Sequence, residues 1–141
     1  MNNLEVDATV DNWGKVYKFL NDCLVNIDAG KKITGRILVA SEEIFVNISR
    51  YAYKLPSGGK VEINFRFEKP SSVVRIKFVD SGIFFDPTKF KPAFAKDSSG
   101  TRSIGGLGLF MVKNIMDKMI YEYKNNQNNL IIIKKIDWLL N

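Results

Sequence analysis

The chain has 141 residues, enough for one domain of ordinary size, and its 45% hydrophobic content can supply a core. The net charge is +6 with the basic residues spread along the chain, so we do not expect direct contact with nucleic acid. The sequence has no histidine and one cysteine, which excludes histidine-based general bases, disulfide frameworks and multi-thiolate metal sites. Because no signal peptide is visible and no apolar run approaches the roughly 20 residues that span a bilayer, we expect a cytoplasmic protein without a membrane segment.

The first half of the chain predicts one strand and two helices. Apolar and polar residues alternate over residues 4–10, as in a half-buried strand. A helical apolar period follows over about 12–27, with Asp11 as its expected cap. It includes the single cysteine, which we expect to be a buried small hydrophobe. A second helical period covers about 33–53 and stops before a Pro-Ser-Gly-Gly turn.

The second half predicts two hairpins separated by a loop and a helix. Strands at 60–68 and 72–80 are joined by a short turn. The irregular stretch 81–104 is long for a compact domain, which is typical of functional or mobile loops. A helix follows at about 106–119, and a final hairpin surrounds the turn at 125–129.

These elements predict an α/β two-layer sandwich. Neighbouring strands joined by hairpins form a mostly antiparallel sheet, and the three helices then cover one of its faces. We find neither an internal repeat nor a linker, so residues 1–141 are expected to form a single domain.

A polar stripe marks the second predicted helix. Glu43, Asn47 and Arg50 follow the i, i+4, i+7 spacing of one helix face, between apolar neighbours. The stripe fits a half-exposed edge of the core with a weak ion pair. It also fits a cleft, because carboxylate and amide oxygens suit Mg²⁺ and a carboxylate one turn away can accept a proton.

The end of the second hairpin strand carries Asp80 and Gly82. A buried carboxylate at this position can accept a hydrogen bond from an exocyclic amine such as that of adenine. The glycine lets a flat ring approach the backbone. An ordinary Asp-Ser-Gly turn explains the same residues.

Three glycines, Gly105, Gly106 and Gly108, stand next to the start of the third helix. Helix N-termini offer free N–H groups and a partial positive charge, so phosphate can bind there. The pattern is neither a P-loop nor a Rossmann fingerprint. Packing of the helix against the rest of the domain is the other explanation.

Taken together and in this order, the three motifs resemble those of the GHKL (Bergerat-fold) ATPases. Glu43-x-x-x-Asn47 resembles their N-box, "DSGIFFDP" over 80–87 their G1 box, and "GGLGL" over 105–109 their G2 box. Within that superfamily, "SEEIFVNISRYAY" and the G1 box look most like the bacterial anti-sigma-factor serine/threonine kinases.

The resemblance implies a nucleotide site with ATP and Mg²⁺ under a lid formed by residues 81–104. Glu43 would be the general base, Asn47 would hold Mg²⁺ and Asp80 would read the adenine amine. Relatives often carry histidine where this chain has Arg50, and threonine on the last hairpin, where it offers Asn128 or Asn129. The implied nucleotide-binding residues are Asn47, Arg50, Asp80, Gly82, Arg102, Gly105, Gly106, Leu107, Gly108 and Leu109, with Lys96 as another candidate lid cation.

The resemblance further implies an ATP-binding anti-sigma factor that phosphorylates an anti-sigma-factor antagonist and so regulates transcription. Its partners would be a sigma factor, the antagonist and a second copy of the chain in a homodimer. The alternative is a non-catalytic nucleotide-binding module that acts by contact alone. A detached ATP-binding domain of a sensor histidine kinase is a third possibility, against which the lack of histidine argues.

Overall fold

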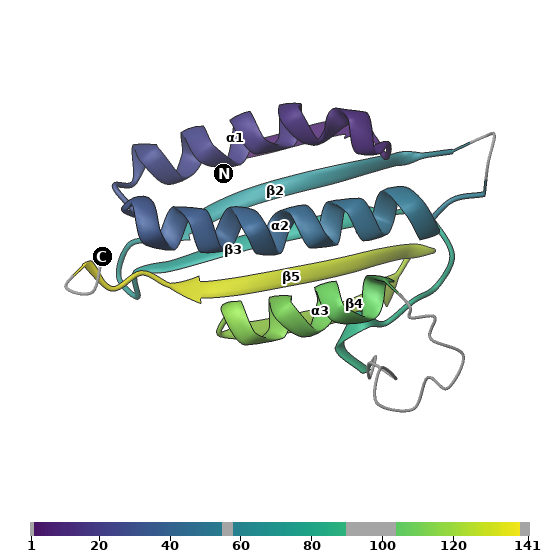
Figure 1. Cartoon of the computed structure of the whole chain (residues 1–141). Helices are drawn as coiled ribbons and strands as arrows, with labels where there is room; N and C mark the ends of the chain where they lie inside the picture. The colour runs from purple at the N-terminus through teal and green to yellow at the C-terminus, as the bar shows by residue number, and fades with distance from the viewer. Residues whose placement is uncertain (1, 55–57, 90–103, 139–141) are drawn as a thin grey trace.

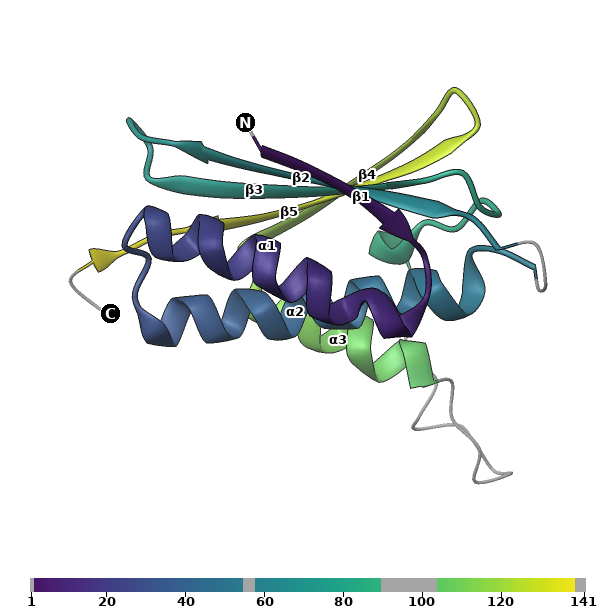
Figure 2. The same ribbon diagram turned by 90° about the horizontal axis from the view of Figure 1, so that it is seen from above.

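The computed structural model describes residues 2–54, 58–89 and 104–138, without the side chains of residues 104–107. Over these residues the chain forms a five-stranded antiparallel sheet with three α-helices on one face (Figure 1, Figure 2). The predicted two-layer sandwich is confirmed. The elements in chain order are β1 (Asn2–Asp7), the 3₁₀ turn η1 (Val10–Asn12), α1 (Trp13–Asn26), α2 (Lys31–Tyr51), β2 (Lys60–Glu68), β3 (Val73–Asp80), the 3₁₀ turn η2 (Pro87–Lys89), α3 (Ile104–Ile115), β4 (Lys118–Lys124) and β5 (Gln127–Lys135).

The sheet has the strand order β1-β2-β3-β5-β4, and every neighbouring pair is antiparallel. Paired residues of β3 and β5 are 48 or more positions apart in sequence, yet the two strands lie side by side near the middle of the sheet. Their register sets Asp80 directly opposite Asn128. This pairing brings two polar side chains together on the helix-covered face.

The core lies between the helix layer and the sheet. Alternate residues of the central strands point toward the helices, as the period of a strand requires. The helices contribute apolar faces, and neither α1 nor α2 has a side-chain cap hydrogen bond, so packing rather than capping positions them. Largest among the fully buried side chains are Leu20, Leu24, Ile37, Ile44, Phe45, Ile63, Ile76, Phe78, Ile132 and Ile136. Cys23 is also buried, as predicted.

Several predicted boundaries were wrong. β1 ends at Asp7, because the Thr9 N–H donates to the Asp7 carbonyl at 2.8 Å and the chain turns into η1. Asp11 therefore lies inside η1 and does not cap α1. α3 ends at Ile115, four residues early, because β4 begins at Lys118 and pairs with β5. None of the helices among the described residues is both long and apolar enough to cross a membrane.

Candidate functional site

A cavity of about 190 Å³ lies where the end of the helix layer meets the ends of β3 and β5. Its wall is mostly apolar, and the chain contributes to it from α2, α3, the sheet and the segment after β3. Such a cavity, with a few converging polar groups, is the usual form of a small-molecule site. It is lined by Ile44, Asn47, Ile48, Tyr51, Ala52, Asp80, Ile83, Phe85, Pro87, Leu109, Tyr121, Asn128 and Leu130.

Asp80 is the buried carboxylate of this cavity, with 6% of its surface exposed. Its Oδ1 accepts hydrogen bonds from the backbone N–H of Gly82 and from Nδ2 of Asn128, both at 2.9 Å. Burial raises the pKa of the Asp80 carboxyl, and these two hydrogen bonds oppose the rise. Oδ2 accepts no hydrogen bond from any residue that the structure describes.

Gly82 lies under the cavity, packed against the end of α2. A Cβ at this position would overlap the backbone carbonyl of Ala52, so the segment after β3 can approach α2 only with glycine here. The approach is fixed by a hydrogen bond from the Ile83 N–H to the same carbonyl, at 2.9 Å. The Tyr53 hydroxyl adds a second link, since it accepts from Ser81 N–H at 2.7 Å and donates to the Lys60 carbonyl at 2.6 Å.

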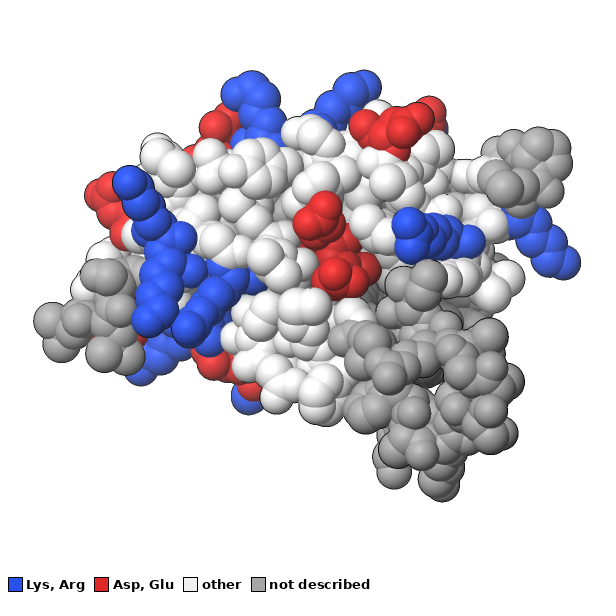
Figure 3. All heavy atoms as spheres, viewed as in Figure 1, with Lys and Arg blue, Asp and Glu red and all other residues white. Residues whose placement is uncertain are grey.

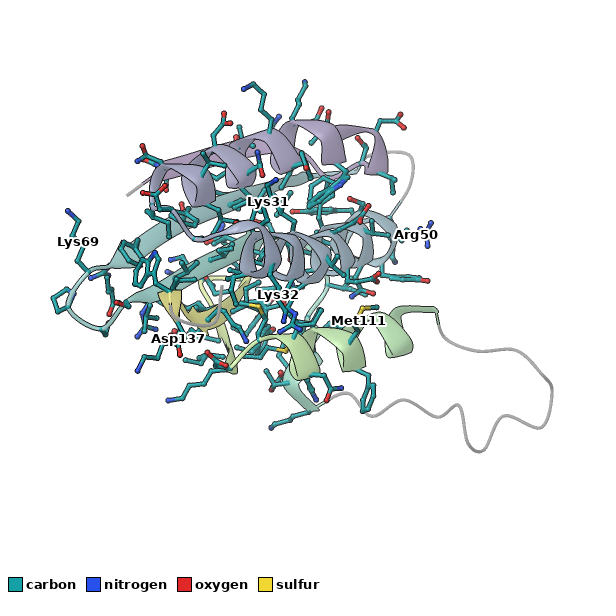
Figure 4. All side chains as sticks on the ribbon, turned by 60° about the vertical axis from the view of Figure 1, so that its left-hand side comes forward. Lys31, Lys32, Arg50, Lys69, Met111 and Asp137 are labelled. Atoms are coloured by element: carbon teal, nitrogen blue, oxygen red, sulfur yellow. The ribbon has the colours of Figure 1, made fainter. Side chains whose placement is uncertain are left out.

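The polar stripe of α2 separates into three environments. Asn47 is half-buried and lines the cavity. Glu43, one turn earlier, is half-buried at the contact between α2 and α3. Arg50 is exposed and its side chain extends away from the end of α2 (Figure 4). Among the described residues Glu43 and Arg50 form no ion pair, so the edge-of-core interpretation with such a pair does not describe this stripe.

The glycine-rich segment lies within α3 rather than before it. α3 begins at Ile104, so Gly105 and Gly106 belong to its first turn, whereas the sequence predicted a start near Gly106. A Cβ on Gly108 would overlap the end of the flexible Glu43 side chain, so this glycine lies at a close contact between α3 and α2. The next residue, Leu109, is buried and lines the cavity. The side chain of Leu107, and the lid residues Lys96 and Arg102, lie outside what the structure describes.

Asn128 is a residue of this site to which the sequence analysis assigned no separate role. It is buried, lines the cavity and makes hydrogen bonds with the side chain of Asp80 and with the segment after β3. Only the pairing of β3 with β5 brings it there. Its position on the last hairpin, where relatives often carry threonine, was the one available signal.

The charged side chains of α2 are divided along the helix. Acidic side chains gather over the middle of α2, and basic side chains gather near its beginning (Figure 3). The acidic residues of α2 are Glu42 and Glu43, and its basic residues are Lys31, Lys32, Arg36 and Arg50. In the described part of the chain no group of three or more His, Cys, Asp or Glu side chains could hold a metal ion.

The fold, together with a match to a family model, defines an ATP-binding domain of the GHKL type. The sequence matches the histidine kinase-like ATPase domain family over residues 6–135, and the chain belongs to that family. Membership implies ATP binding and a kinase-like or related ATP-using role.

Two curated relatives are sensor proteins from Vibrio vulnificus. The autoinducer 2 sensor kinase/phosphatase LuxQ of strain CMCP6 is 34% identical over 91 residues, which cover 57% of this chain and 11% of that protein. The LuxQ protein of strain YJ016 is 33% identical over 91 residues, which again cover 57% of this chain and 11% of that protein. The chain therefore spans about a tenth of the length of these relatives.

Two solved structures share the fold. The RsbU and RsbW domains of Rv1364c from Mycobacterium tuberculosis match with a TM-score of 0.64 and 16% identity, over 96% of this chain and 33% of that one. The histidine kinase domain of the blue-light activated histidine kinase from Erythrobacter litoralis EL346 matches with a TM-score of 0.55 and 11% identity, over 93% of this chain and 62% of that one. At these identities the likeness establishes the fold alone.

Proposed function

We propose that this protein is an ATP-binding anti-sigma factor that phosphorylates an antagonist protein on serine or threonine. The observation that carries the nucleotide part is Asp80, a buried carboxylate with one oxygen unused by the described residues, beside an apolar cavity. Apolar walls suit a flat heterocycle, and the unused Oδ2 suits an exocyclic amine that donates to it. Adenine has both properties.

The phosphate end of the site is assigned to α2 and α3. Asn47 lines the cavity, and its amide oxygen is a suitable ligand for Mg²⁺, which would neutralise charge on the transferring phosphoryl group. The first turn of α3 carries glycines whose N–H groups suit phosphate. We assign the remaining sequence-predicted residues to nucleotide binding as well: Arg50, Gly82, Arg102, Gly105, Gly106, Leu107, Gly108 and Leu109.

Glu43 is the proposed general base. It lies one helical turn before Asn47 on the same face of α2, at the contact with α3. From there the carboxylate would accept the proton of a partner's serine hydroxyl as that oxygen bonds to the γ-phosphorus, while the bond from the γ-phosphorus to the bridging oxygen breaks and ADP leaves. Its neighbour Glu42 is exposed on another face of the helix and has no such role.

Glu43→Gln tests this assignment. A general base contributes about 10²- to 10⁴-fold, so phosphate transfer from labelled ATP to the antagonist should fall at least about 100-fold. Affinity for ADP, measured by calorimetry, should stay within about twofold, because the proposed role concerns transfer alone. Glu42→Gln is the matched control and should change neither. Transfer by the Glu43→Gln protein at the wild-type rate would reject Glu43 as the base.

The assembly belongs to the same proposal. We propose that the chain forms a homodimer in the cytoplasm and sequesters a sigma factor until the antagonist displaces it. Light scattering coupled to gel filtration measures the dimer, and co-elution with a purified sigma factor measures the complex. A monomer that binds no sigma factor at micromolar concentration would reject this part while leaving nucleotide binding intact.

A second candidate function follows from the likeness to the LuxQ sensor kinases. The 141 residues contain no histidine, so a phosphorylated histidine would lie outside them. The product distinguishes the two functions, because phosphoserine survives acid and phosphohistidine does not. Nucleotide binding without transfer to any protein would instead favour a regulatory module that acts by contact alone.

A further inference from the structure

We propose that Asn128 is a positioning residue that anchors one oxygen of Asp80 and so leaves the other directed at the base of the nucleotide. The selectivity of the site for an amino group over a carbonyl group would then depend on Asn128 without any contact between Asn128 and the ligand. This inference rests on the proposed function, since it concerns the same cavity.

The partners of the Asn128 amide fix its orientation. Its Nδ2 lies 2.9 Å from Oδ1 of Asp80 and 2.9 Å from the Ile83 carbonyl oxygen, and an ionised carboxylate and a carbonyl only accept hydrogen bonds. Its Oδ1 accepts from the Phe85 N–H at 3.2 Å and from the Tyr121 hydroxyl. Exchanging the nitrogen and oxygen would put two acceptors together on one side and two N–H donors together on the other.

These four contacts use the whole hydrogen-bonding capacity of the amide. A primary amide has two N–H donors and an oxygen with two lone pairs, and each is taken by the protein. A further carbonyl, that of Gly82, lies 3.5 Å from Nδ2, at the limit of a hydrogen bond. Asn128 lines the cavity but has no donor or acceptor left for a ligand, so its effect on binding must pass through its partners.

Asp80 is the partner that faces the ligand. Its Oδ1 is held by Asn128 and by the Gly82 N–H, so rotation of the carboxylate would break both hydrogen bonds. Oδ2 then keeps a fixed direction and offers only an acceptor, which pairs with an amino group and opposes a carbonyl oxygen. An anchored acceptor discriminates more strongly than one free to rotate, because the anchored group cannot turn away from the wrong ligand.

The direct test is Asn128→Leu in the full chain. This change keeps the approximate size of the side chain, adds no charge beside Asp80, and removes the donors to Asp80 and Ile83 together with the acceptor for Phe85 and Tyr121. Calorimetry would give the dissociation constants of ADP and of inosine diphosphate, which has a carbonyl in place of the adenine amine. We expect the wild type to prefer ADP by at least about tenfold, the equivalent of one charged hydrogen bond, and the variant to lose most of that preference.

Asn129→Leu is the matched control. Asn129 is the next residue of β5, and by the alternation of a strand its side chain lies on the opposite face of the sheet. Its Nδ2 donates to the Gln127 carbonyl at 3.2 Å, away from the cavity. The control variant should therefore keep the wild-type ratio of the two dissociation constants.

The outcomes separate the two hypotheses. A wild type that binds neither nucleotide, or both equally, would remove the proposed adenine site and the inference with it. A wild type that prefers ADP, with an Asn128→Leu variant that keeps the ratio within twofold, would overturn the positioning role alone. A lower melting temperature with an unchanged ratio means a purely structural role and also overturns it. If Asn128→Leu does not fold, Tyr121→Phe decides. Losing only the hydroxyl that donates to Asn128 should lower the ratio about threefold, and an unchanged ratio would contradict the positioning role.

Discussion

At the scale of single residues, Asp80 places an unfavourable charge inside the protein. Its pKa is raised in the folded state, so the native chain holds this proton more tightly than the unfolded chain. Stability therefore falls as the pH rises through the interval between the ordinary value of 3.8 and the raised value, and the cost is fully present above that interval. A buried carboxylate that opposes folding is a common feature of functional sites.

The first prediction is that Asp80→Asn separates folding from binding. The amide oxygen can still accept from Gly82 and Asn128, and the buried charge is gone. At pH 7 the melting temperature should equal or exceed that of the wild type, and the difference should shrink as the pH falls toward 3.8. ADP affinity should fall at least about tenfold, because the new NH₂ group opposes the adenine amine. Circular dichroism and calorimetry measure the two effects.

Asp7→Asn is the control with the opposite sign. A hydrogen bond and the charge of Lys60 lower the pKa of the Asp7 carboxyl, so Asp7 contributes stability above its unfolded pKa that is lost as the pH falls through its folded pKa. At pH 7 this variant should be no more stable than the wild type, and its affinity for ADP should equal that of the wild type. An Asp80→Asn protein that melts below the wild type at pH 7, or binds ADP equally well, would contradict the first prediction.

The sequence could indicate Asp80 but could not give Asn128 its role. Asp80 stands at the end of a strand next to a glycine, so its position is visible in a local pattern. The role of Asn128 depends on the register between β3 and β5, which pairs residues 48 positions apart. Local periodicity carries no information on such a pairing, and the residue therefore emerges only from the folded chain.

At the scale of elements, the glycines differ in what they contact. Gly82 approaches a backbone carbonyl of α2, Gly108 approaches the flexible side chain of Glu43, and Gly35 on α2 faces open space. The sequence alone treats all three as loose backbone. The atoms around each glycine determine whether a methyl group is sterically excluded, is accommodated by movement of a side chain, or fits without any change.

The second prediction compares Gly82→Ala with Gly35→Ala. The Cβ at position 82 would overlap the Ala52 carbonyl, so the chain after β3 must shift, at a cost of about 1–3 kcal/mol as for other overpacked sites. The Cβ at position 35 meets nothing within 4 Å, and helix propensity should add about 1 kcal/mol of stability. Urea unfolding measures both free energies. Equal midpoints for the two variants would contradict the packing argument.

The third prediction concerns the contact between α2 and α3. Gly108→Ala gains helix propensity but displaces the Glu43 carboxylate, so the free energy of unfolding should change by less than about 1 kcal/mol. If Glu43 is the base, phosphate transfer should fall at least about tenfold. In the Glu43→Gln background the same substitution should have little further effect on transfer, because the group that it displaces is already inactive. Independent, multiplicative losses would show that position 108 acts by another route.

The elements themselves were more predictable than their ends. The periods of 3.6 and 2 residues located all three α-helices and the five strands that the structure describes, because each element buries one face. The end of α3 was missed because Met119 and its neighbours carry an apolar pattern compatible with either structure. Pairing of Met119 with Ile132 selects the strand. Strand pairing is non-local, so it overrides a local helical pattern that the sequence alone favours.

At the scale of the whole molecule, the cavity joins the two layers of the sandwich. Its wall comes from α2 and α3 on one side and from β3, β4 and β5 on the other, so a bound ligand contacts elements from both layers. Unfolding separates these layers and destroys the cavity. Ligand binding should therefore raise the stability of the whole described chain in one unfolding transition, and not that of a separately folded part.

The fourth prediction is a ligand-dependent melting temperature. At ADP concentrations of 100 times the dissociation constant, binding should add about 2.7 kcal/mol. For a domain of about 150 residues each kcal/mol corresponds to about 2–4 °C, so the midpoint should rise by about 5–11 °C. Differential scanning calorimetry should show a single unfolding transition whose midpoint rises.

Two controls test where the ligand binds. Asp80→Asn should show little shift at the same ADP concentration. Inorganic triphosphate should shift the wild type less than ADP does, because only ADP fills the apolar cavity. A shift of equal size with triphosphate and with ADP would mean that the cavity beside Asp80 is not where the base binds.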